Sequence, residues 1–317
     1  MLENFNTKGD LKKMIRITKT PAEANALTHI GVAHADEILG AVILEKYLEL
    51  YGKILVLCRT ARVPENLADD IVVFDIGHGK FDHHQPGGNG CRPNGIPYAS
   101  AGLLWMEFGP AIVAGTPNPK RVWEDVDRIL IQGVDAVDNG VLPQLDYPVQ
   151  PLSVSGVLSS FNPTWDSDED SDAAFMSAFL YAKAIFENIL KRSIASAKAQ
   201  GLFEEYLAKA EGHIMVLEKY IPWMEYIFSP AYEKAKDIWF VVFPSNRGGY
   251  NWQCVPDKFG SFGQRKPVPT SWKGLRDQEL RDVTGVATAT FCHPAGFIGG
   301  AETLEGAIQM ARLAVEA

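Results

Sequence analysis

The chain has 317 residues, 46% hydrophobic and 22% charged, which is typical of a globular protein with room for two cores. Its formal charge of −9 argues against a broad basic surface that wraps duplex nucleic acid, because such binding needs clustered Lys and Arg. No stretch approaches the roughly 18 consecutive apolar residues of a membrane span, and the start lacks the apolar run of a signal peptide. We therefore expect a cytoplasmic protein that does not enter a membrane.

The first half of the chain alternates short apolar runs with helical patterns. Strands are predicted at residues 26–32, 53–60 and 70–77. Helices are predicted at residues 34–52, 100–109 and 119–140. This alternation predicts an α/β fold with a mostly parallel sheet flanked by helices, where ligands bind beyond the carboxyl ends of the strands.

The composition changes at residues 162–172, where five of the last seven residues are acidic. A cation site is one interpretation, but we favour the start of a helix, because carboxylates interact well with its positive N-terminal end. An Ala-rich helix is expected from there to about residue 210. Four further strands and a final helix are predicted at residues 213–218, 236–245, 250–256, 287–294 and 304–317. We predict two domains, residues 1–190 and a smaller α/β domain at residues 191–317.

The cysteines are far apart and form no C-x-x-C pair. We expect all four to be buried free thiols. They are Cys58, Cys91, Cys254 and Cys292.

Five of the seven histidines lie between residues 29 and 84, beside predicted strand ends that also carry aspartates. Four of these histidines, with neighbouring acids and two later aspartates, form four groups: His29, His34, Asp36 and Glu37; Asp75; Asp82, His83 and His84; Asp135 and Asp138. Carboxylates can bridge two cations while neutral imidazoles complete each ligand shell, a mixture that suits metal-assisted hydrolysis. Any single residue of these groups could have a structural role. Four groups at the ends of predicted strands and helices, however, favour a site for two divalent cations, and the imidazoles favour Mn²⁺ over Mg²⁺.

These groups belong to longer motifs: T-H-I-G-V-A-H-A-D-E at residues 28–37, D-H-H-Q at 82–85, A-S-A-G-L-L-W at 99–105, V-D-A-V-D-N-G at 134–140 and F-C-H-P-A-G-F-I-G-G at 291–300. With them the chain resembles the DHH phosphoesterases, and among these most closely the MYG-type exonucleases, over residues 27–310. The resemblance implies a DHH phosphoesterase fold, a catalytic metal-binding domain at residues 1–190 and a substrate-binding domain at residues 191–317. It also implies hydrolysis of phosphodiesters through a metal-activated water, as a 3'-to-5' exonuclease on RNA or single-stranded ends.

Carried over by position, the resemblance assigns six metal ligands: His29, His34, Asp36, Asp75, His83 and Asp135. It places His84 opposite the scissile phosphate, with Asp75 as a shared carboxylate and Asp82 orienting a neighbouring histidine. Two positions depart from the family pattern, since Ile30 replaces an Asn and Ala33 a Phe. Neither is a ligand, so we expect the metals to be kept and the substrate preference to be affected.

The second domain carries candidate phosphate-binding residues: Arg247, Gly248, Arg265, His293, Gly299 and Gly300. Arginine offers a planar fork that matches phosphate oxygens, and glycines let backbone N–H groups approach them. The alternative is that the glycines only make turns and that Arg247 is a solvated surface residue.

Two other functions stay open. The same metals could serve a phosphoesterase for small substrates, such as oligonucleotides, cyclic dinucleotides or pyrophosphate. A metal-binding regulatory protein without catalysis is the third hypothesis, motivated by Ile30 and Ala33. Expected partners are RNA, single-stranded ends or short oligonucleotides, with self-association into a homo-oligomer as a further option.

Overall fold

The structure is a computed structural model that describes residues 15–142, 149 and 151–317. The expectation that the chain starts without a signal peptide falls on residues 1–14 and lies outside the described residues. Backbone contacts divide the chain into two compact units, Met1–Ala195 and Ser196–Ala317. The predicted division of function between residues 1–190 and 191–317 stays a prediction.

A four-stranded, fully parallel sheet organises the first unit, with the strand order β1-β3-β2-β4. The strands are β1 (Ile15–Thr18), β3 (Leu55–Thr60), β2 (Ala26–His29) and β4 (Val72–Val73). The predicted parallel sheet is confirmed, although β1 was not expected from the sequence. Because β2 and β4 are hydrogen-bonded neighbours, the segments after these two strands start side by side at one edge of the sheet.

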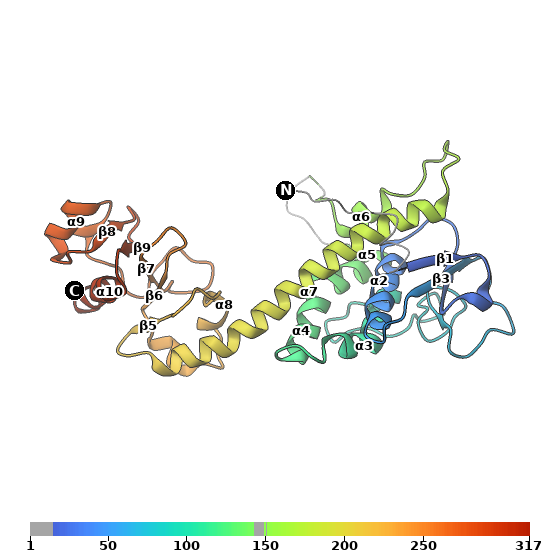
Figure 1. Ribbon diagram of the computed structural model, residues 1–317, viewed down its shortest axis with the longest axis horizontal. Helices are drawn as coiled ribbons and strands as arrows, with labels where there is room; N and C mark the ends of the chain where they lie inside the picture. Colours follow the sequence, from blue (N-terminus) through green and yellow to red (C-terminus); the bar gives the residue numbers. More distant parts are fainter. Residues whose placement is uncertain (1–14, 143–148, 150) are drawn as a thin grey trace. The chain divides into compact units, whose positions relative to one another are not determined.

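Helix α2 (Ala35–Glu49) is the central helix of this unit and lies beside α3 (Ser100–Val113) (Figure 1). It is buried on all sides from Ala35 to Glu45, because helices and the sheet surround it. Gly40 permits the close approach of α3, since a side chain there would collide with Leu104 and Phe74. The metal-site candidates Asp36 and Glu37 therefore begin a rigid, enclosed helix.

The predicted helix at residues 119–140 is continuous but not regular. It consists of α4 (Pro119–Val126), a π-helical segment η2 (Asp127–Ile131) and α5 (Gln132–Asp138). A π-helical turn shifts the rotational register of the helix beyond it and is often found at functional sites. The short elements η1 (Pro21–Glu23) and α6 (Val154–Ser159) complete the unit before α7.

Helix α7 (Ser171–Lys209) contributes to both units. Phe175, Phe179 and Phe186 are buried in the first unit, and Phe203 and Tyr206 in the second. By length and composition alone α7 also meets the requirement for a membrane span. We attribute its apolar composition to these two cores.

The acidic segment leads into α7, as favoured from the sequence. Asp172 in its first turn forms ion pairs with Lys19 and with Arg59, where Arg59 Nη1 lies 3.1 Å from Asp172 Oδ1. These pairs connect the start of α7 to β3 and to the segment just after β1.

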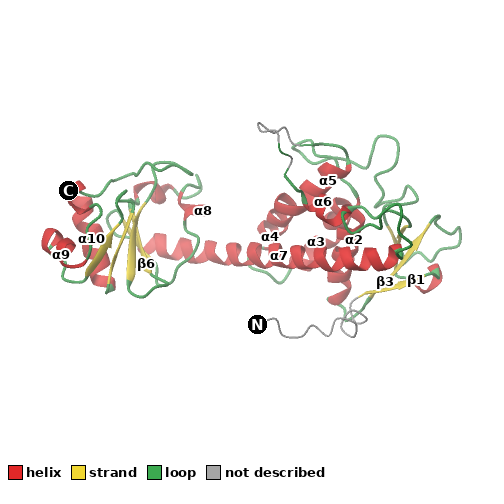
Figure 2. Cartoon of the chain, turned by 90° about the horizontal axis from the view of Figure 1, so that it is seen from above, coloured by secondary structure: helices red, strands yellow, loops and turns green. Residues whose placement is uncertain are grey.

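The second unit contains a mixed sheet with the order β5-β6-β7-β9-β8, in which only β5 and β6 are parallel. The strands are β5 (Ile214–Val216), β6 (Phe240–Pro244), β7 (Tyr250–Cys254), β9 (Ile298–Ala301) and β8 (Ala289–Cys292). The helices are α8 (Met224–Ile227), η3 (Glu233–Asp237), η4 (Thr270–Trp272), α9 (Asp277–Thr284) and α10 (Leu304–Glu316). Helix α10 packs on the sheet, as Figure 2 shows, and strand β9 was not expected from the sequence.

Three of the four thiols are buried as predicted, namely Cys58, Cys254 and Cys292. The prediction is wrong for Cys91, which is exposed. Cys91 lies in the irregular segment between β4 and α3, where it forms an isolated bridge to Pro97.

Candidate metal centre

The carboxyl edge of the parallel sheet collects the predicted metal ligands. His29 is the last residue of β2, and Asp75 lies two residues after the end of β4. Asp75 has a left-handed backbone with φ 57°, which aspartate tolerates better than most residues. Its N–H donates to the carbonyl of Phe81 at 3.1 Å, so the turn is closed and the carboxylate direction is set.

His29 is enclosed by two carboxylates. Its Nε2 contacts Oε2 of Glu37 directly and lies 3.2 Å from Asp75 Oδ2. Burial by itself lowers the pKa of His29, but the hydrogen bonds to Asp75 and Glu37 and the charge of Glu37 raise that pKa to about 11. The two carboxylates around His29 thus favour its protonated form.

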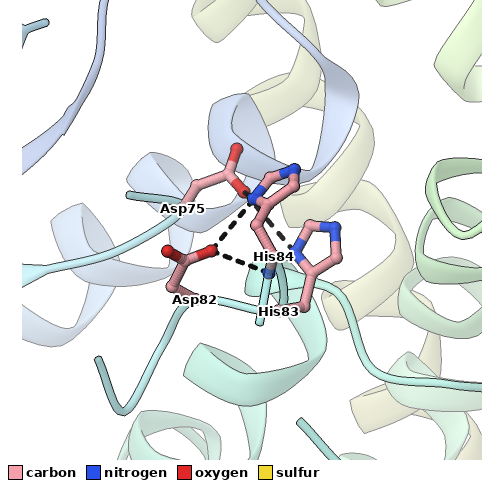
Figure 3. Close-up of side chains that lie close together, drawn as sticks. All are labelled: Asp75, Asp82, His83 and His84. Atoms are coloured by element: carbon pink, nitrogen blue, oxygen red, sulfur yellow. Dashed lines mark hydrogen bonds and ion pairs between the residues drawn. The ribbon is translucent and has the colours of Figure 1, made fainter. Parts of the chain in front are cut away.

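The D-H-H segment lies directly beside Asp75, and Figure 3 shows the four side chains pointing toward one another. Asp82 Oδ1 accepts from the N–H of His84 at 3.0 Å and lies 2.9 Å from His84 Nδ1. His83 and His84 present their Nδ1 atoms 3.5 and 3.4 Å from Asp75 Oδ1. Ligand atoms from Asp75, Asp82, His83 and His84 all lie within 4.8 Å of one another.

Asp82 has the contacts expected of a residue that orients its neighbours. Burial alone raises the pKa of this carboxyl, but hydrogen bonds from His84 and from the backbone N–H of His78 lower it below its usual range. Asp82 therefore stays ionised and holds the imidazole of His84, whose side chain is half exposed at the mouth of the site.

From the last group, Asp135 and Asp138, the residue that lies beside the other candidate ligands is Asp138. Its Oδ2 lies 2.8 Å from His83 Nε2, and ligand atoms of His34, Asp36 and Asp138 lie within 4.8 Å of one another. Hydrogen bonding to His83 lowers the pKa of Asp138, although burial opposes this. Asp138 was noted in the sequence but not selected as a ligand.

Asp135 was selected instead, and the structure does not bring it to the other predicted ligands. Its Oδ2 pairs with Arg92 Nη1 at 2.8 Å, and its Oδ1 accepts from the N–H of Gly102 at 3.0 Å. Burial raises the pKa of Asp135 to about 7, against the effect of Arg92. We therefore correct the assignment: Asp138 takes the place predicted for Asp135, which joins α5 to α3 and to Arg92 through buried contacts.

Glu37 is a second residue that the selection of ligands missed. It is fully buried in the first turn of α2 and contacts His29, and its Oε1 lies 3.7 Å from Arg59 Nη2. Arg59 also donates to the carbonyl of Gly31 at 2.8 Å and so supports the loop between His29 and His34. In the sequence, the position of Glu37 directly after Asp36 at the start of the helix could have indicated its place in the site. Nothing in the sequence indicated that Arg59 lies there.

The donor set fits divalent cations. Within the described residues, the buried atoms Asp36 Oδ1 and Glu37 Oε1 have no hydrogen-bond partner, and buried Asp75 Oδ2 faces His29 Nε2. Burial raises the pKa of Asp36 well above its usual range, and the charges of Asp75 and Asp138 raise it further. Buried carboxylates crowded in this way need positive charge, and mixed imidazole and carboxylate ligands suit divalent metal ions.

A separate cavity of about 640 Å³ lies in the second unit. It is lined by the predicted Arg247, Gly248 and Gly300, and also by Arg276, which was not selected from the sequence. Arg247 is on the β6–β7 turn, where its N–H donates to Ser245 Oγ at 3.2 Å. The guanidinium of Arg276 lies 5.8 Å from the centre of the Phe291 ring, so two arginines and an aromatic ring share this cavity.

The other predicted substrate residues have different surroundings. Arg265 Nη1 donates to the carbonyls of Ala235, Lys236 and Ile238, so it ties down the end of η3 and does not line the cavity. His293 accepts from the N–H of Ala295 within its own turn and is also outside the cavity lining.

The paired glycines of β9 are explained by packing. A side chain at Gly299 would collide with the indole of Trp252, and one at Gly300 with the ring of Phe291. Gly299 and Gly300 therefore lie in a strand rather than a turn, and their missing side chains make room for aromatic rings.

Sequence comparisons place these features among known proteins. The family model for MYG1 exonucleases, described as "Uncharacterised protein family (UPF0160)", matches residues 25–315. The "MYG1 exonuclease" of Rattus norvegicus is 34% identical over 90% of this chain and 83% of its own length, and that of Homo sapiens 32% over 90% and 84%. The "MYG1 protein YER156C" of Saccharomyces cerevisiae is 32% identical over 91% and 94%. No solved structure matches the chain.

Proposed function

We propose that this chain, which belongs to the MYG1 exonuclease family, is a metal-dependent phosphodiesterase of the DHH type that acts as an exonuclease. Family membership confirms the resemblance to the MYG-type exonucleases inferred from the sequence motifs. Relatives named "MYG1 exonuclease" support a nuclease function. The metal dependence and the DHH relationship are inferred from the site.

One observation carries the proposal: imidazoles and carboxylates from four separate segments converge at the carboxyl edge of the sheet, with buried carboxylate oxygens that lack a donor among the described residues. The residues that would hold the cations are His29, His34, Asp36, Asp75, His83 and Asp138, with Glu37 against His29. Divalent cations bound there would lower the pKa of a water and stabilise charge on the phosphodiester oxygens.

The chain itself supplies His84 at the mouth of the site. Asp82 holds its Nδ1 at 2.9 Å, which leaves Nε2 for a phosphate oxygen or a leaving group. Half of the His84 side chain is exposed, so a substrate can reach it without rearrangement of the fold. We assign His84 to substrate contact and proton delivery, and Asp82 to its orientation.

The substrate is proposed to be RNA or a single-stranded end, degraded from 3' to 5'. The cavity in the second unit offers Arg247 and Arg276 for a phosphate and the Phe291 ring for a base. A chain with a net charge of −9 suits the grip of a short end better than the coating of a duplex.

The test is to incubate the purified protein with Mn²⁺ and end-labelled RNA, DNA and dinucleotides, with Mg²⁺ and chelator in parallel. We expect Mn²⁺-dependent release of nucleotides from the 3' end, with longer single strands preferred over dinucleotides. Preference for dinucleotides would support the phosphoesterase for small substrates. Metal binding without any turnover would support the regulatory protein.

Two variants make this assay specific to the site. Asp75→Asn should remove most activity and leave the fold intact, because a neutral amide cannot replace a carboxylate among cations. Asp168→Asn is the matched control, because Asp168 is an exposed acid just before the start of α7. Mn²⁺-dependent turnover retained by Asp75→Asn would contradict the proposed centre.

A further inference from the structure

Ser100 lies inside the proposed metal centre although it belongs to none of the histidine and aspartate groups. It is the first residue of α3 and has no exposed surface. A serine at a helix start often accepts a backbone N–H as a cap. Here the N-cap position is Ala99 and no side chain caps α3, so the Ser100 hydroxyl serves another purpose.

That hydroxyl contacts two predicted ligands. Ser100 Oγ donates to Asp75 Oδ1 at 3.0 Å and lies 3.5 Å from His83 Nδ1. The backbone N–H of Ser100 donates to Asp36 Oδ2 at 3.3 Å. One buried residue thus touches three side chains that come from α2, the segment after β4 and the D-H-H motif.

These hydrogen bonds use one of the two carboxylate oxygens of Asp75 and one of Asp36. Asp75 Oδ1 and Asp36 Oδ2 are occupied by Ser100. Asp36 Oδ1 is buried and has no hydrogen-bond partner within the described residues, and buried Asp75 Oδ2 lies 3.2 Å from His29 Nε2. Each carboxylate therefore has one oxygen held by Ser100, while the other faces away from Ser100, that of Asp75 toward the predicted ligand His29.

The contact between Ser100 and His83 also orients a predicted ligand. A histidine that binds a metal through one nitrogen usually has the other held by a hydrogen-bond partner. Ser100 Oγ and Asp75 Oδ1 each lie 3.5 Å from His83 Nδ1, while His83 Nε2 lies 2.8 Å from Asp138 Oδ2. A proton on Nδ1 held by these oxygens would leave Nε2 as the nitrogen that binds a cation.

We propose that Ser100 is a positioning residue for the metal centre, which holds Asp75, Asp36 and His83 so that their free atoms face the cations. The inference rests on the metal centre of the proposed function. It adds that the hydroxyl sets metal affinity, and that loss of the hydroxyl weakens binding without loss of the fold.

The test measures Mn²⁺ binding to the full chain by calorimetry, together with the visible spectrum of the Co²⁺-loaded protein, which reports ligand geometry. Ser100→Ala should weaken Mn²⁺ binding by about tenfold or more and change the Co²⁺ spectrum, since partners of metal ligands typically contribute 10- to 100-fold in affinity. Ser193→Ala is the matched control, because Ser193 is a buried serine in the first unit whose hydroxyl has no partner among the described residues. Its affinity and spectrum should equal those of the parent.

Ser100→Thr and Ser100→Val form a second comparison, since their side chains have the same shape and differ by the hydroxyl. We expect the Thr variant to bind Mn²⁺ more tightly than the Val variant. An affinity of Ser100→Ala within twofold of the parent would overturn the proposal. If Ser100→Ala does not fold, equal affinities of the Thr and Val variants would overturn it. A parent protein that binds no Mn²⁺ would refute the metal centre itself, and this outcome is distinct from a failure of the role of Ser100.

Discussion

His83 Nε2 lies 2.8 Å from Asp138 Oδ2, and this contact joins the D-H-H segment to the last residue of α5. The two residues are 55 positions apart in the sequence. Asp135, one turn earlier in the same helix, instead forms an ion pair with Arg92. The two aspartates of one motif therefore have different partners.

Exchange of each aspartate for asparagine should separate their roles. Asp138→Asn should weaken Mn²⁺ binding by more than about tenfold, with little change in stability. Substitution of a residue that only hydrogen-bonds to a metal ligand already has an effect of about this size. Asp135→Asn should lower the free energy of unfolding by about 3 kcal/mol, because it leaves Arg92 with a buried charge that only Asp127 compensates. Calorimetry and urea unfolding measure the two effects. Equal loss of metal in both variants would restore Asp135 to the ligand set.

Metal binding should release protons. The pKa of His29 is raised to about 11 in the metal-free protein, so at neutral pH the imidazole carries a proton that a metal ligand must lose. A raised pKa favours the protonated form below that pH, and therefore the apparent Mn²⁺ affinity should increase as the pH rises from about 6 to about 9. Calorimetry in buffers of different ionisation enthalpy counts the protons. An affinity that does not change over this range would contradict the prediction.

Arg247→Ala should raise KM for oligonucleotides more than it lowers kcat, because a residue that holds a remote phosphate contributes mainly to binding. A very small phosphodiester should be nearly indifferent to the change. Arg312→Ala serves as the control, since Arg312 lines a different cavity of the same unit. Equal loss of activity on small and long substrates would assign Arg247 to the catalytic centre.

Ile30→Asn should change substrate preference without loss of metal. Ile30 and Val32 are 45% and 63% exposed on the loop between His29 and His34. The loop backbone is anchored through Gly31 to Arg59 and through Ala33 to Asn162, so both side chains face solvent on a rigid support. Loss of apolar contact worth about 1 kcal/mol would raise KM about fivefold. Steady-state kinetics on oligonucleotides would show this, and unchanged KM values would leave Ile30 without a role.

One thiol of the native protein should react rapidly with a thiol reagent. Burial raises the pKa of Cys254 to about 12 and of Cys292 to about 11, so neither forms the reactive thiolate at neutral pH, and Cys58 is also buried. Exposed Cys91 is the expected site. Cys91→Ser should abolish the fast phase, whereas the unfolded parent chain should titrate four thiols. A fast phase that survives the substitution would show that the cores open readily.

Local patterns were sufficient for the main elements of the fold. The alternation of β-branched runs with helical periodicity predicted β2, β3 and β4, helix α2 between the first two and helix α3 after β4, because these signals depend on neighbouring residues. Strands β1 and β9 were missed, and β9 contains paired glycines, which weaken the pattern of a strand. Those glycines are required by Trp252 and Phe291, which lie on other strands of the sheet.

The sequence by itself determined which residue types form the candidate centre and that they lie after strand ends. The tertiary structure decided which of them meet. Asp138 rather than Asp135 lies beside the D-H-H segment, because its carboxylate pairs with His83 whereas that of Asp135 pairs with Arg92. Ser100 and Arg59 reach the ligands only through the packing of α3 and β3. Helix phase and long-range ion pairs depend on the packing of whole elements, and no local pattern of residues encodes them.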